Sequence, residues 1–190
     1  MKLSVAQFPT QFPQLETERL MLGELTLDDK EGVFGNFSDE EVTRYLMQPF
    51  SSLEQAESII KAFLEEYEQG ASVTWAIRLK RDRTFIGTCS CEMKPGFRGE
   101  LGFDLSKAHW GRGYMSEAIG AIVAYGFEKL ELNRIEAHTL LLNSRAIHLL
   151  KRLGFQVDGV LRDSSWGSGR FWDEVFFSLH GKDWARSCML

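Results

Sequence analysis

Apolar positions in the first 70 residues recur at the spacing of one short strand and two helices. We expect the strand over 20–25 and the first helix over 26–37, where a Thr-Leu-Asp-Asp start precedes apolar residues. The second helix is expected over 53–67, because its apolar residues return every three or four positions. Two serines followed by Glu and Gln form overlapping capping boxes before this helix, and Gly70 ends it.

The remaining residues alternate between strand patterns and helix patterns. Strands are expected at 73–79, 85–93, 100–105, 134–140, 155–166 and 171–179, and helices at 114–129 and 144–152. With the earlier elements this gives about seven strands and about four helices, in an order that neither a doubly wound fold nor a barrel of alternating units has. We therefore predict a mixed α/β (α+β) fold, with a largely antiparallel central sheet flanked by helices. Because no repeat, linker or low-complexity stretch interrupts residues 1–190, they are expected to form a single domain.

Composition and charge exclude several classes of protein. A hydrophobic content of 44% and a charged content of 26% are typical of a globular chain. The net charge of -5 argues against nucleic-acid binding, because no basic stripe could neutralise many phosphates. No apolar run approaches the ~20 residues that cross a bilayer, and the N-terminus lacks the apolar stretch of a signal peptide. We therefore expect a cytoplasmic protein that binds neither nucleic acid nor membranes.

The cysteines point the same way. There are three of them, so they cannot all pair with one another. Cys89 and Cys91 lie two residues apart in a predicted strand, a spacing that does not suit zinc. Reduced thiols and no bound metal are the expectation, as in most cytoplasmic proteins.

The segment from His109 to Ala118 is the most informative stretch of the sequence. A predicted strand at 100–105 precedes it, two glycines occupy its loop, and a predicted helix begins at Tyr114. Such a turn presents unpaired backbone N–H groups, and the helix dipole adds partial positive charge behind them. It is therefore a candidate site for a phosphate or pyrophosphate group.

Two common nucleotide-binding loops do not fit this segment. A dinucleotide-binding loop needs a third glycine where Ser116 stands, and a repeated βαβ unit that the predicted element order lacks. A Walker loop needs a lysine followed by Ser or Thr after the glycines, and no such pair stands there. The segment therefore stays a candidate phosphate site of another kind.

Further segments accompany the glycine loop in a fixed order along the chain. They are Thr17–Leu22, Trp75–Ile77, Ile86–Gly87, Glu100–Phe103, Trp110–Ala118, Leu132–Ala137, Asn143, Lys151–Phe155 and Asp173–Val175. This ordered set resembles the GNAT family of acetyl-CoA-dependent N-acetyltransferases, nearly from end to end. Within the family, the chain resembles the ribosomal-protein-alanine N-acetyltransferases, which acetylate N-terminal amines.

The chain departs from the family pattern at two places. Trp110 and Met115 stand where the broader family has Gln or Arg and Gly or Ala, a substitution that is typical of the subgroup. It removes one cationic side chain from the phosphate site and leaves Arg112 as the nearest positive charge. Ala146 stands where the subgroup commonly has a serine, three residues after Asn143. If that hydroxyl is the acid in relatives, another group must replace it here.

The resemblance implies how acetyl-CoA would be held. It implies that the strand backbone at Phe103, Asp104 and Leu105 pairs with the pantetheine arm. It also implies that the pyrophosphate lies against the loop and helix start, formed by Trp110, Gly111, Arg112, Gly113, Tyr114, Met115 and Ser116, and that Asn143 contacts the cofactor. The family's reaction is direct attack of a neutral amine on the thioester, with no covalent enzyme intermediate and no metal.

Two residues are candidates for the proton transfer that this chemistry requires. Glu100 opens the cofactor strand, where subgroup members often carry a carboxylate. His138 lies on the neighbouring strand, five residues before Asn143, where some relatives place a catalytic carboxylate. The structural alternatives are a solvated carboxylate at a strand end and a strand histidine satisfied by its neighbours.

These features predict an enzyme that transfers acetyl from acetyl-CoA to a primary amine. The expected acceptor is the N-terminal α-amine of a protein, such as a ribosomal protein. A small-molecule amine, such as a polyamine or an aminoglycoside-like antibiotic, is the alternative acceptor. A catalytically silent acyl-CoA-binding sensor is the alternative from another class. Subgroup members are often dimers, so the resemblance also suggests a homodimer.

Overall fold

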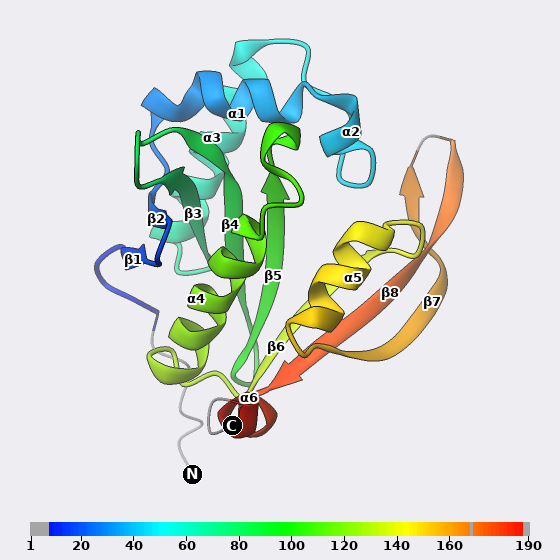
Figure 1. Cartoon of the computed structure of the whole chain (residues 1–190). Helices are drawn as coiled ribbons and strands as arrows, with labels where there is room; N and C mark the ends of the chain where they lie inside the picture. The colour runs from blue at the N-terminus through cyan, green and yellow to red at the C-terminus, as the bar shows by residue number, and fades with distance from the viewer. Residues whose placement is uncertain (1–7, 168, 188–190) are drawn as a thin grey trace.

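The strand and helix patterns produce the elements drawn in Figure 1, a computed structural model that describes residues 8–167 and 169–187. The strands are β1 (Leu15–Glu16), β2 (Leu20–Glu24), β3 (Ser72–Leu79), β4 (Phe85–Lys94), β5 (Arg98–Leu105), β6 (Arg134–Leu140), β7 (Gln156–Gly167) and β8 (Arg170–His180). The α-helices are α1 (Lys30–Phe37), α2 (Glu40–Thr43), α3 (Leu53–Glu68), α4 (Tyr114–Glu128), α5 (Ser144–Arg152) and α6 (Gly181–Ser187). Two 3-10 turns, η1 (Leu27–Asp29) and η2 (Lys107–His109), precede α1 and α4.

The predicted fold class is confirmed: the described strands form one sheet that is antiparallel at every join but one. The bounds of β6 and α5 agree with the predicted ranges. Three elements were not predicted, namely β1, α2 and α6. The side chain of Asp39 accepts a hydrogen bond from the Glu41 backbone N–H and so begins α2. This helix has only four residues and an acidic start, so it shows no apolar period.

The sheet opens between β5 and β6. The strand order is β1-β2-β3-β4-β5-β6-β8-β7, and β5–β6 is the parallel join. These two strands pair only over Arg98–Glu100 and Arg134–Glu136. Beyond those pairs Figure 1 shows them diverging. We call the opening between their separated parts, 101–105 and 137–140, the wedge.

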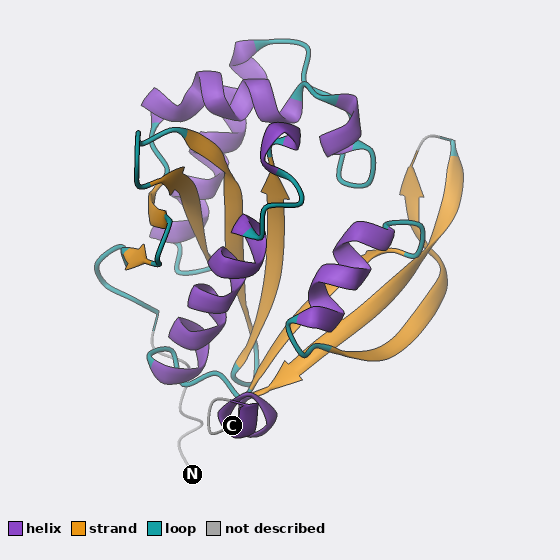
Figure 2. Cartoon of the chain, in the orientation of Figure 1, coloured by secondary structure: helices purple, strands orange, loops and turns teal. Residues whose placement is uncertain are grey.

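Helices cover both faces of the sheet (Figure 2). The alternation of strand residues sends Ile77 toward α4 and its neighbour Ala76 toward α1 and α3. The larger core lies on the side of α4 and α5, and its buried members include Trp75, Ile77, Ile119, Ile122, Leu150 and Phe177. α4 therefore packs against the β5 side of the wedge and α5 against the β6 side. None of the described helices is long and apolar enough to span a membrane.

Candidate active site

Two glycines shape the loop that leads from β5 into α4. Gly111 and Gly113 have φ values of 72° and 80°, in the left-handed region where a side chain is strained. Gly113 is the N-cap of α4, so the free N–H groups of the first helical turn follow directly behind it. This is a backbone arrangement that binds anions at helix starts.

An ion pair from the start of the chain holds this loop in place, and we call it the loop latch. Arg19 donates from Nε to the Glu117 carboxylate at 2.7 Å and from Nη1 to the Arg112 carbonyl at 2.9 Å. Its Nη2 also lies 2.6 Å from the same carboxylate as an ion pair. Thr17 Oγ1 and the Arg19 backbone N–H also donate to Glu117. Burial alone would raise the pKa of Glu117, but these hydrogen bonds outweigh burial and hold that pKa below its usual value. This role of Thr17 and Arg19 was not predicted from the sequence, because their partner Glu117 lies about a hundred residues further along the chain.

A cavity of about 460 Å³ lies between the glycine loop, the end of β5 and α5. The predicted cofactor residues that line it are Phe103, Asp104, Leu105, Trp110, Gly111, Gly113, Tyr114, Met115, Ser116 and Asn143. Arg112 is the one predicted cofactor residue outside this lining, although its carbonyl takes part in the loop latch. The structure therefore gathers residues from three separate stretches of sequence around one hollow. Their contacts with a cofactor stay a prediction.

Two other parts of the chain complete the cavity walls. α2 and the residues after it contribute Val42, Tyr45 and Leu46, and α5 contributes Arg145 and Arg152. The first group gave no sequence signal, because α2 itself was not predicted. The two arginines are seven residues apart, which places them on one face of a helix two turns apart. That spacing predicts a shared face for the two arginines, but it does not show that this face borders the cavity.

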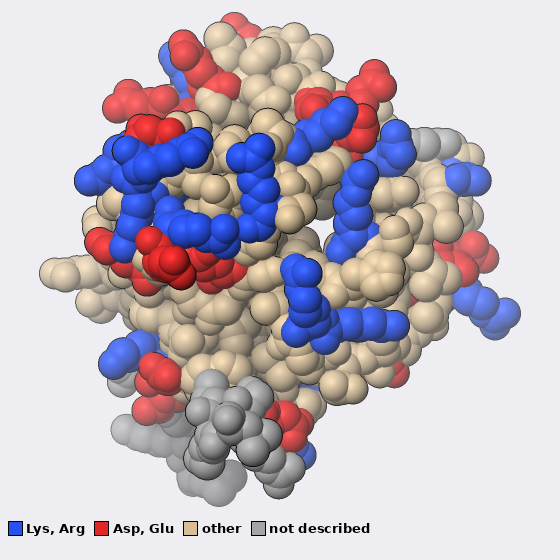
Figure 3. All heavy atoms as spheres, viewed as in Figure 1, with Lys and Arg blue, Asp and Glu red and all other residues tan. Residues whose placement is uncertain are grey.

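Arg145 and Arg152 supply positive charge to the cavity. The guanidinium of Arg145 lies 4.2 Å from the ring centroid of Trp110, and Arg152 donates from Nη2 to Ser116 Oγ at 2.7 Å. Figure 3 shows Lys and Arg side chains around the hollow between α4 and α5. The expectation that Arg112 is the nearest cation is therefore incomplete. Trp110 takes the place of a cationic side chain, but it carries Arg145 on its ring.

Two side chains of the predicted cofactor set also fix the local backbone. Trp110 Nε1 donates to the Leu105 carbonyl at 2.7 Å, which fastens the glycine loop to the end of β5. Asn143 caps α5 by accepting from the Ala146 N–H at 3.3 Å, and it donates from Nδ2 to Thr139 Oγ1 at 3.0 Å. Ala146 itself lines the cavity, so a methyl group stands where the subgroup commonly has a hydroxyl.

The carboxyl group of Asp104 serves contacts inside the protein. The residue is 6% exposed, and its side chain accepts hydrogen bonds from Asn36 Nδ2, Thr88 Oγ1 and the Thr88 backbone N–H. Burial raises the pKa of Asp104 to about 7, although these hydrogen bonds act in the opposite direction. The side chain therefore joins α1 and β4 to the cofactor strand.

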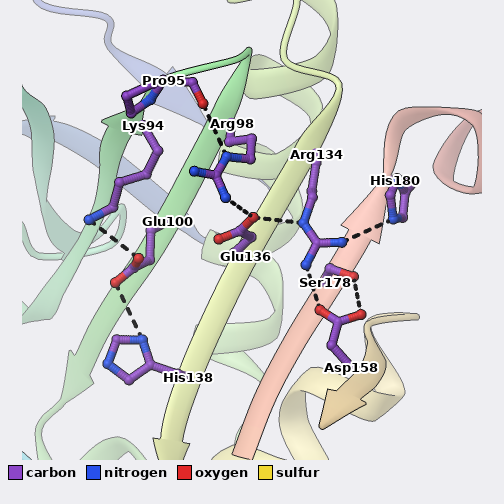
Figure 4. Close-up of polar contacts among 10 residues, drawn as sticks. All are labelled: Lys94, Pro95, Arg98, Glu100, Arg134, Glu136, His138, Asp158, Ser178 and His180. Atoms are coloured by element: carbon purple, nitrogen blue, oxygen red, sulfur yellow. Dashed lines mark hydrogen bonds and ion pairs between the residues drawn. The ribbon is translucent and has the colours of Figure 1, made fainter.

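The two candidate proton-transfer residues meet where the wedge begins (Figure 4). His138 Nδ1 lies 3.3 Å from Glu100 Oε1, and Lys94 Nζ lies 3.4 Å from Glu100 Oε2. Neither Glu100 nor His138 is part of the cavity lining. Glu100 belongs to the last β5–β6 pair, with Glu136, and His138 lies two residues further along β6. A carboxylate beside an imidazole can accept a proton and exchange it with its neighbour, so this pair is suited to acid–base chemistry.

A second set of charges in Figure 4 reinforces the short β5–β6 join. Glu136 accepts from Arg98 Nη1 at 3.1 Å and from Arg134 Nε at 2.7 Å. Arg134 also donates to Asp158 at 2.6 Å, and Ser178 Oγ donates to the same carboxylate at 2.9 Å. These contacts connect β5, β6, β7 and β8 at the closed end of the wedge.

Known proteins are similar to this chain in sequence and in architecture. Residues 19–156 match the family model described as the Acetyltransferase (GNAT) domain. The chain belongs to the GNAT acetyltransferase family. It is 38% identical over 174 residues to the uncharacterized N-acetyltransferase p20 of Bacillus licheniformis. The matched region covers 90% of this chain and 98% of that protein. It is 33% identical over 123 residues, 63% of each chain, to the ribosomal protein uS5-alanine N-acetyltransferase of Escherichia coli.

The fold of this GNAT protein is also that of solved acetyltransferase structures. The ribosomal L7/L12 α-N-protein acetyltransferase in complex with coenzyme A matches 88% of this chain and 98% of its own, with a TM-score of 0.81 at 14% identity. GNAT acetyltransferases use acetyl-CoA, so the protein is an acetyl-CoA-dependent N-acetyltransferase. The glycine loop, the start of α4 and the two arginines of α5 are chemically suited to its phosphates. Within the described residues, no group of three His, Cys, Asp or Glu side chains forms a metal site.

Proposed function

We propose that this N-acetyltransferase acts on the N-terminal α-amine of a protein, with Glu100 as the group that accepts the proton of the amine. The observation that carries the proposal is the position of the Glu100 carboxylate, held between Lys94 and His138 where the wedge begins. The name of the Escherichia coli relative, which specifies a ribosomal-protein alanine, supports the choice of acceptor.

The strength of the base favours an α-amine over a lysine side chain. An α-amine has a pKa of about 7.8, and a lysine side chain has a pKa of about 10.4. Deprotonation of the α-amine at neutral pH therefore costs about 3.5 kcal/mol less free energy. A carboxylate is a modest base at this pH, and it can act directly or through one water molecule. It therefore suits the less basic of the two amines.

The remaining residues hold and orient the reactants. In the proposal, the backbone at 103–105 positions the pantetheine arm, and the loop amides of 111–116 receive the pyrophosphate. Acetyl-CoA supplies the thioester carbonyl that the amine attacks. His138 lies against the Glu100 carboxylate and orients it, and Asn143 contacts the cofactor where α5 begins.

Calorimetry tests the cofactor part of the proposal. Acetyl-CoA is titrated into the protein, with NADH and ATP as controls for other phosphate-bearing ligands. We expect binding of acetyl-CoA alone, in the micromolar range. A folded sample that fails to bind acetyl-CoA at millimolar concentration would contradict the assignment of the glycine loop.

Acetyl transfer to chosen amines tests the acceptor. An alanine-initiated peptide with a free α-amine is compared with the same peptide blocked at its N-terminus and carrying one lysine, and with spermidine and kanamycin. We expect transfer to the free α-amine and at least about a hundredfold loss of kcat in Glu100→Gln, with acetyl-CoA affinity retained. Preferred transfer to spermidine or kanamycin would replace the protein acceptor with a small amine. Binding of acetyl-CoA without transfer to any amine would favour a sensor.

A further inference from the structure

The face of β6 and β8 turned away from α5 carries a row of aromatic and charged side chains. Phe177 is buried on the α5 side of β8. Because successive strand residues point to opposite faces, Trp172, Glu174 and Phe176 share the other face, where His138 pairs with Phe176 across β6 and β8. We call these four residues the acceptor row. They are not fully buried, so this face is accessible from solvent.

His138 connects the acceptor row to the candidate base. Its ring stacks on Phe176, with ring centroids 5.1 Å apart and an interplanar angle of 16°. In this orientation Nδ1 faces Glu100 at 3.3 Å, and Nε2 faces Glu174 at 3.9 Å. One imidazole ring therefore separates the two carboxylates, and an amine that approaches Glu100 along the row also passes Glu174.

Glu174 differs from the neighbouring carboxylates in its charge environment. Glu100 lies 3.4 Å from the ammonium of Lys94, and Glu136 is paired with two arginines. The Glu174 side chain is 14% exposed, and within the described part of the chain its one ion-pair contact is with His138. A largely buried carboxylate without a Lys or Arg partner has lost hydration and has gained little opposite charge. A bound cation would supply that charge.

The aromatic members of the row suit an organic cation. Trp172 and Phe176 flank Glu174 at two-residue spacing on the same face, and aromatic faces attract ammonium groups. Trp172 already holds a cation, because the Arg170 guanidinium lies 3.4 Å from its ring centroid.

We propose that Glu174 is a specificity-determining residue that binds the acceptor amine in its ammonium form, beside the rings of Trp172 and Phe176. This inference rests on the proposed function, because it places the acetylated amine at the wedge. The bound ammonium then passes one proton to Glu100 through a water molecule, because the His138 ring lies between the two carboxylates. One N–H bond of the amine breaks as the water gains a proton, the water gives another proton to form an O–H bond on Glu100, and the neutral amine keeps the electron pair with which it attacks. Glu174 thereby selects amines that are cationic in solution over alcohols and amides.

Replacement of Glu174 by Gln removes the charge and keeps the shape of the side chain. Acceptors are screened from alanine-, serine- and methionine-initiated peptides, spermidine and kanamycin, and the best is used for kinetics. We expect Glu174→Gln to raise the KM of the amine about tenfold or more, from the loss of one charge-assisted hydrogen bond, with kcat changed less than about threefold. The inhibition constant of the N-acetylated product should change less than about twofold, because its amide carries no charge.

Two further variants separate charge from structure. Asp173→Asn removes a carboxylate one residue away on the opposite face of β8, where Asp173 accepts from the Asp163 backbone N–H at 3.0 Å. This matched control should leave the KM of the amine unchanged. Glu174→Asp keeps the charge and should recover most of the lost affinity. Thermal unfolding and acetyl-CoA titration of each variant check that the fold is intact.

A measurement on the unsubstituted protein tests the inference without any variant. The N,N-dimethylated acceptor carries a protonated amine with one N–H for Glu174 and cannot form an N-acetyl amide, so it should inhibit more strongly than the N-acetylated product. Inhibition by this cation that is weaker than inhibition by the N-acetylated product would overturn the inference. An unchanged KM of the amine in Glu174→Gln would also overturn it, and so would an equal loss of affinity for the amine and the N-acetylated product in that variant. In those cases acetyl transfer by the unsubstituted protein would leave the proposed function standing. Failure to acetylate any member of the panel would refute the proposed function and the inference together.

Discussion

At the scale of single residues, the carboxyl group of Asp104 lies between α1, β4 and β5, where Asn36 and Thr88 donate to it. Burial raises its pKa from 3.8 to about 7. The folded state therefore binds the proton more tightly than the unfolded state does. The stability that this proton contributes is fully present below pH 3.8 and is lost as the pH rises through about 7.

Replacement of Asp104 by Asn removes this titration and keeps a side chain of similar shape. Relative to the unsubstituted protein, we expect Asp104→Asn to gain stability as the pH rises from 5 to 8. The gain is on the order of 3 kcal/mol, at ~1.36 kcal/mol per pKa unit. Urea unfolding of both proteins at several pH values measures the difference. A difference that does not change with pH would contradict the raised pKa.

Gly113 tests the backbone geometry of the phosphate loop. It has a φ of 80°, and a Cβ at this position would lie 3.4 Å from Arg19 Nη2. We expect Gly113→Ala to lower stability by about 1–2 kcal/mol and to weaken acetyl-CoA binding. Gly120→Ala is the matched control, because Gly120 lies inside α4 and an added Cβ would meet nothing within 4 Å apart from its chain neighbours and the backbone of its own helix. The control should gain about 0.5–1 kcal/mol in thermal unfolding and bind acetyl-CoA normally.

Residue-level prediction from the sequence works where local backbone chemistry decides the role. The glycine loop and the Asn143 cap need only their immediate neighbours, and the structure has both. The partners of Glu117 and Trp110, by contrast, come from distant parts of the chain. Arg19 lies almost a hundred residues before Glu117, and Arg145 reaches Trp110 from another helix. Such contacts follow from the tertiary arrangement and leave no trace in local spacing.

At the scale of elements, the loop latch connects the start of β2 to the first turn of α4. Three hydrogen bonds and one further ion-pair contact converge on the Glu117 carboxylate from Thr17 and Arg19. Replacement by Gln removes the charge, so we expect Glu117→Gln to lower stability by about 2 kcal/mol and to weaken acetyl-CoA binding through a looser loop. Urea unfolding and calorimetry measure the two effects.

The ion pair between Glu57 and Lys61 on α3 provides the comparison for the latch. Both side chains are largely exposed, and they are joined by one contact of 2.6 Å within a single helix. Exposed pairs of this kind contribute little to stability. Glu57→Gln should leave unfolding and cofactor binding unchanged, and equal effects of the two substitutions would argue against a specific role of the latch.

Elements with a strong apolar period could be predicted, and short elements could not. α5 and β6 have the predicted bounds because their patterns are regular and their ends carry clear signals, such as the Asn143 cap. β1 has two residues, and its existence depends on pairing with β2. α2 depends on the Asp39 cap and on its position beside the cavity. Tertiary contacts decide elements of this length.

At the scale of the whole molecule, the wedge divides the sheet into two parts with a narrow join. Each strand contributes three residues to that join, and charged side chains around Glu136 reinforce it. A ligand lying in the wedge would contact both parts at once. Binding should therefore protect the separated segments 101–105 and 137–140 from hydrogen exchange.

Hydrogen exchange with and without acetyl-CoA tests this expectation. Binding to the folded state alone stabilises it by about 2.7 kcal/mol when the free ligand is at about 100 times its Kd, so the melting temperature should rise as well. NADH at the same concentration should have neither effect. Thermal stabilisation without protection of the two wedge segments would place the ligand elsewhere.

The regular register of β8 has a consequence for how this protein can change in evolution. Every residue from Glu174 to His180 pairs with β6 without a bulge, and alternate residues face α5 or the acceptor row. β7, by contrast, absorbs two irregularities in its pairing with β8. Point substitutions along the row can therefore alter the amine that is accepted while α5 stays packed. A one-residue insertion in β8 would exchange the two faces, so length variation in this hairpin is expected to fall in β7.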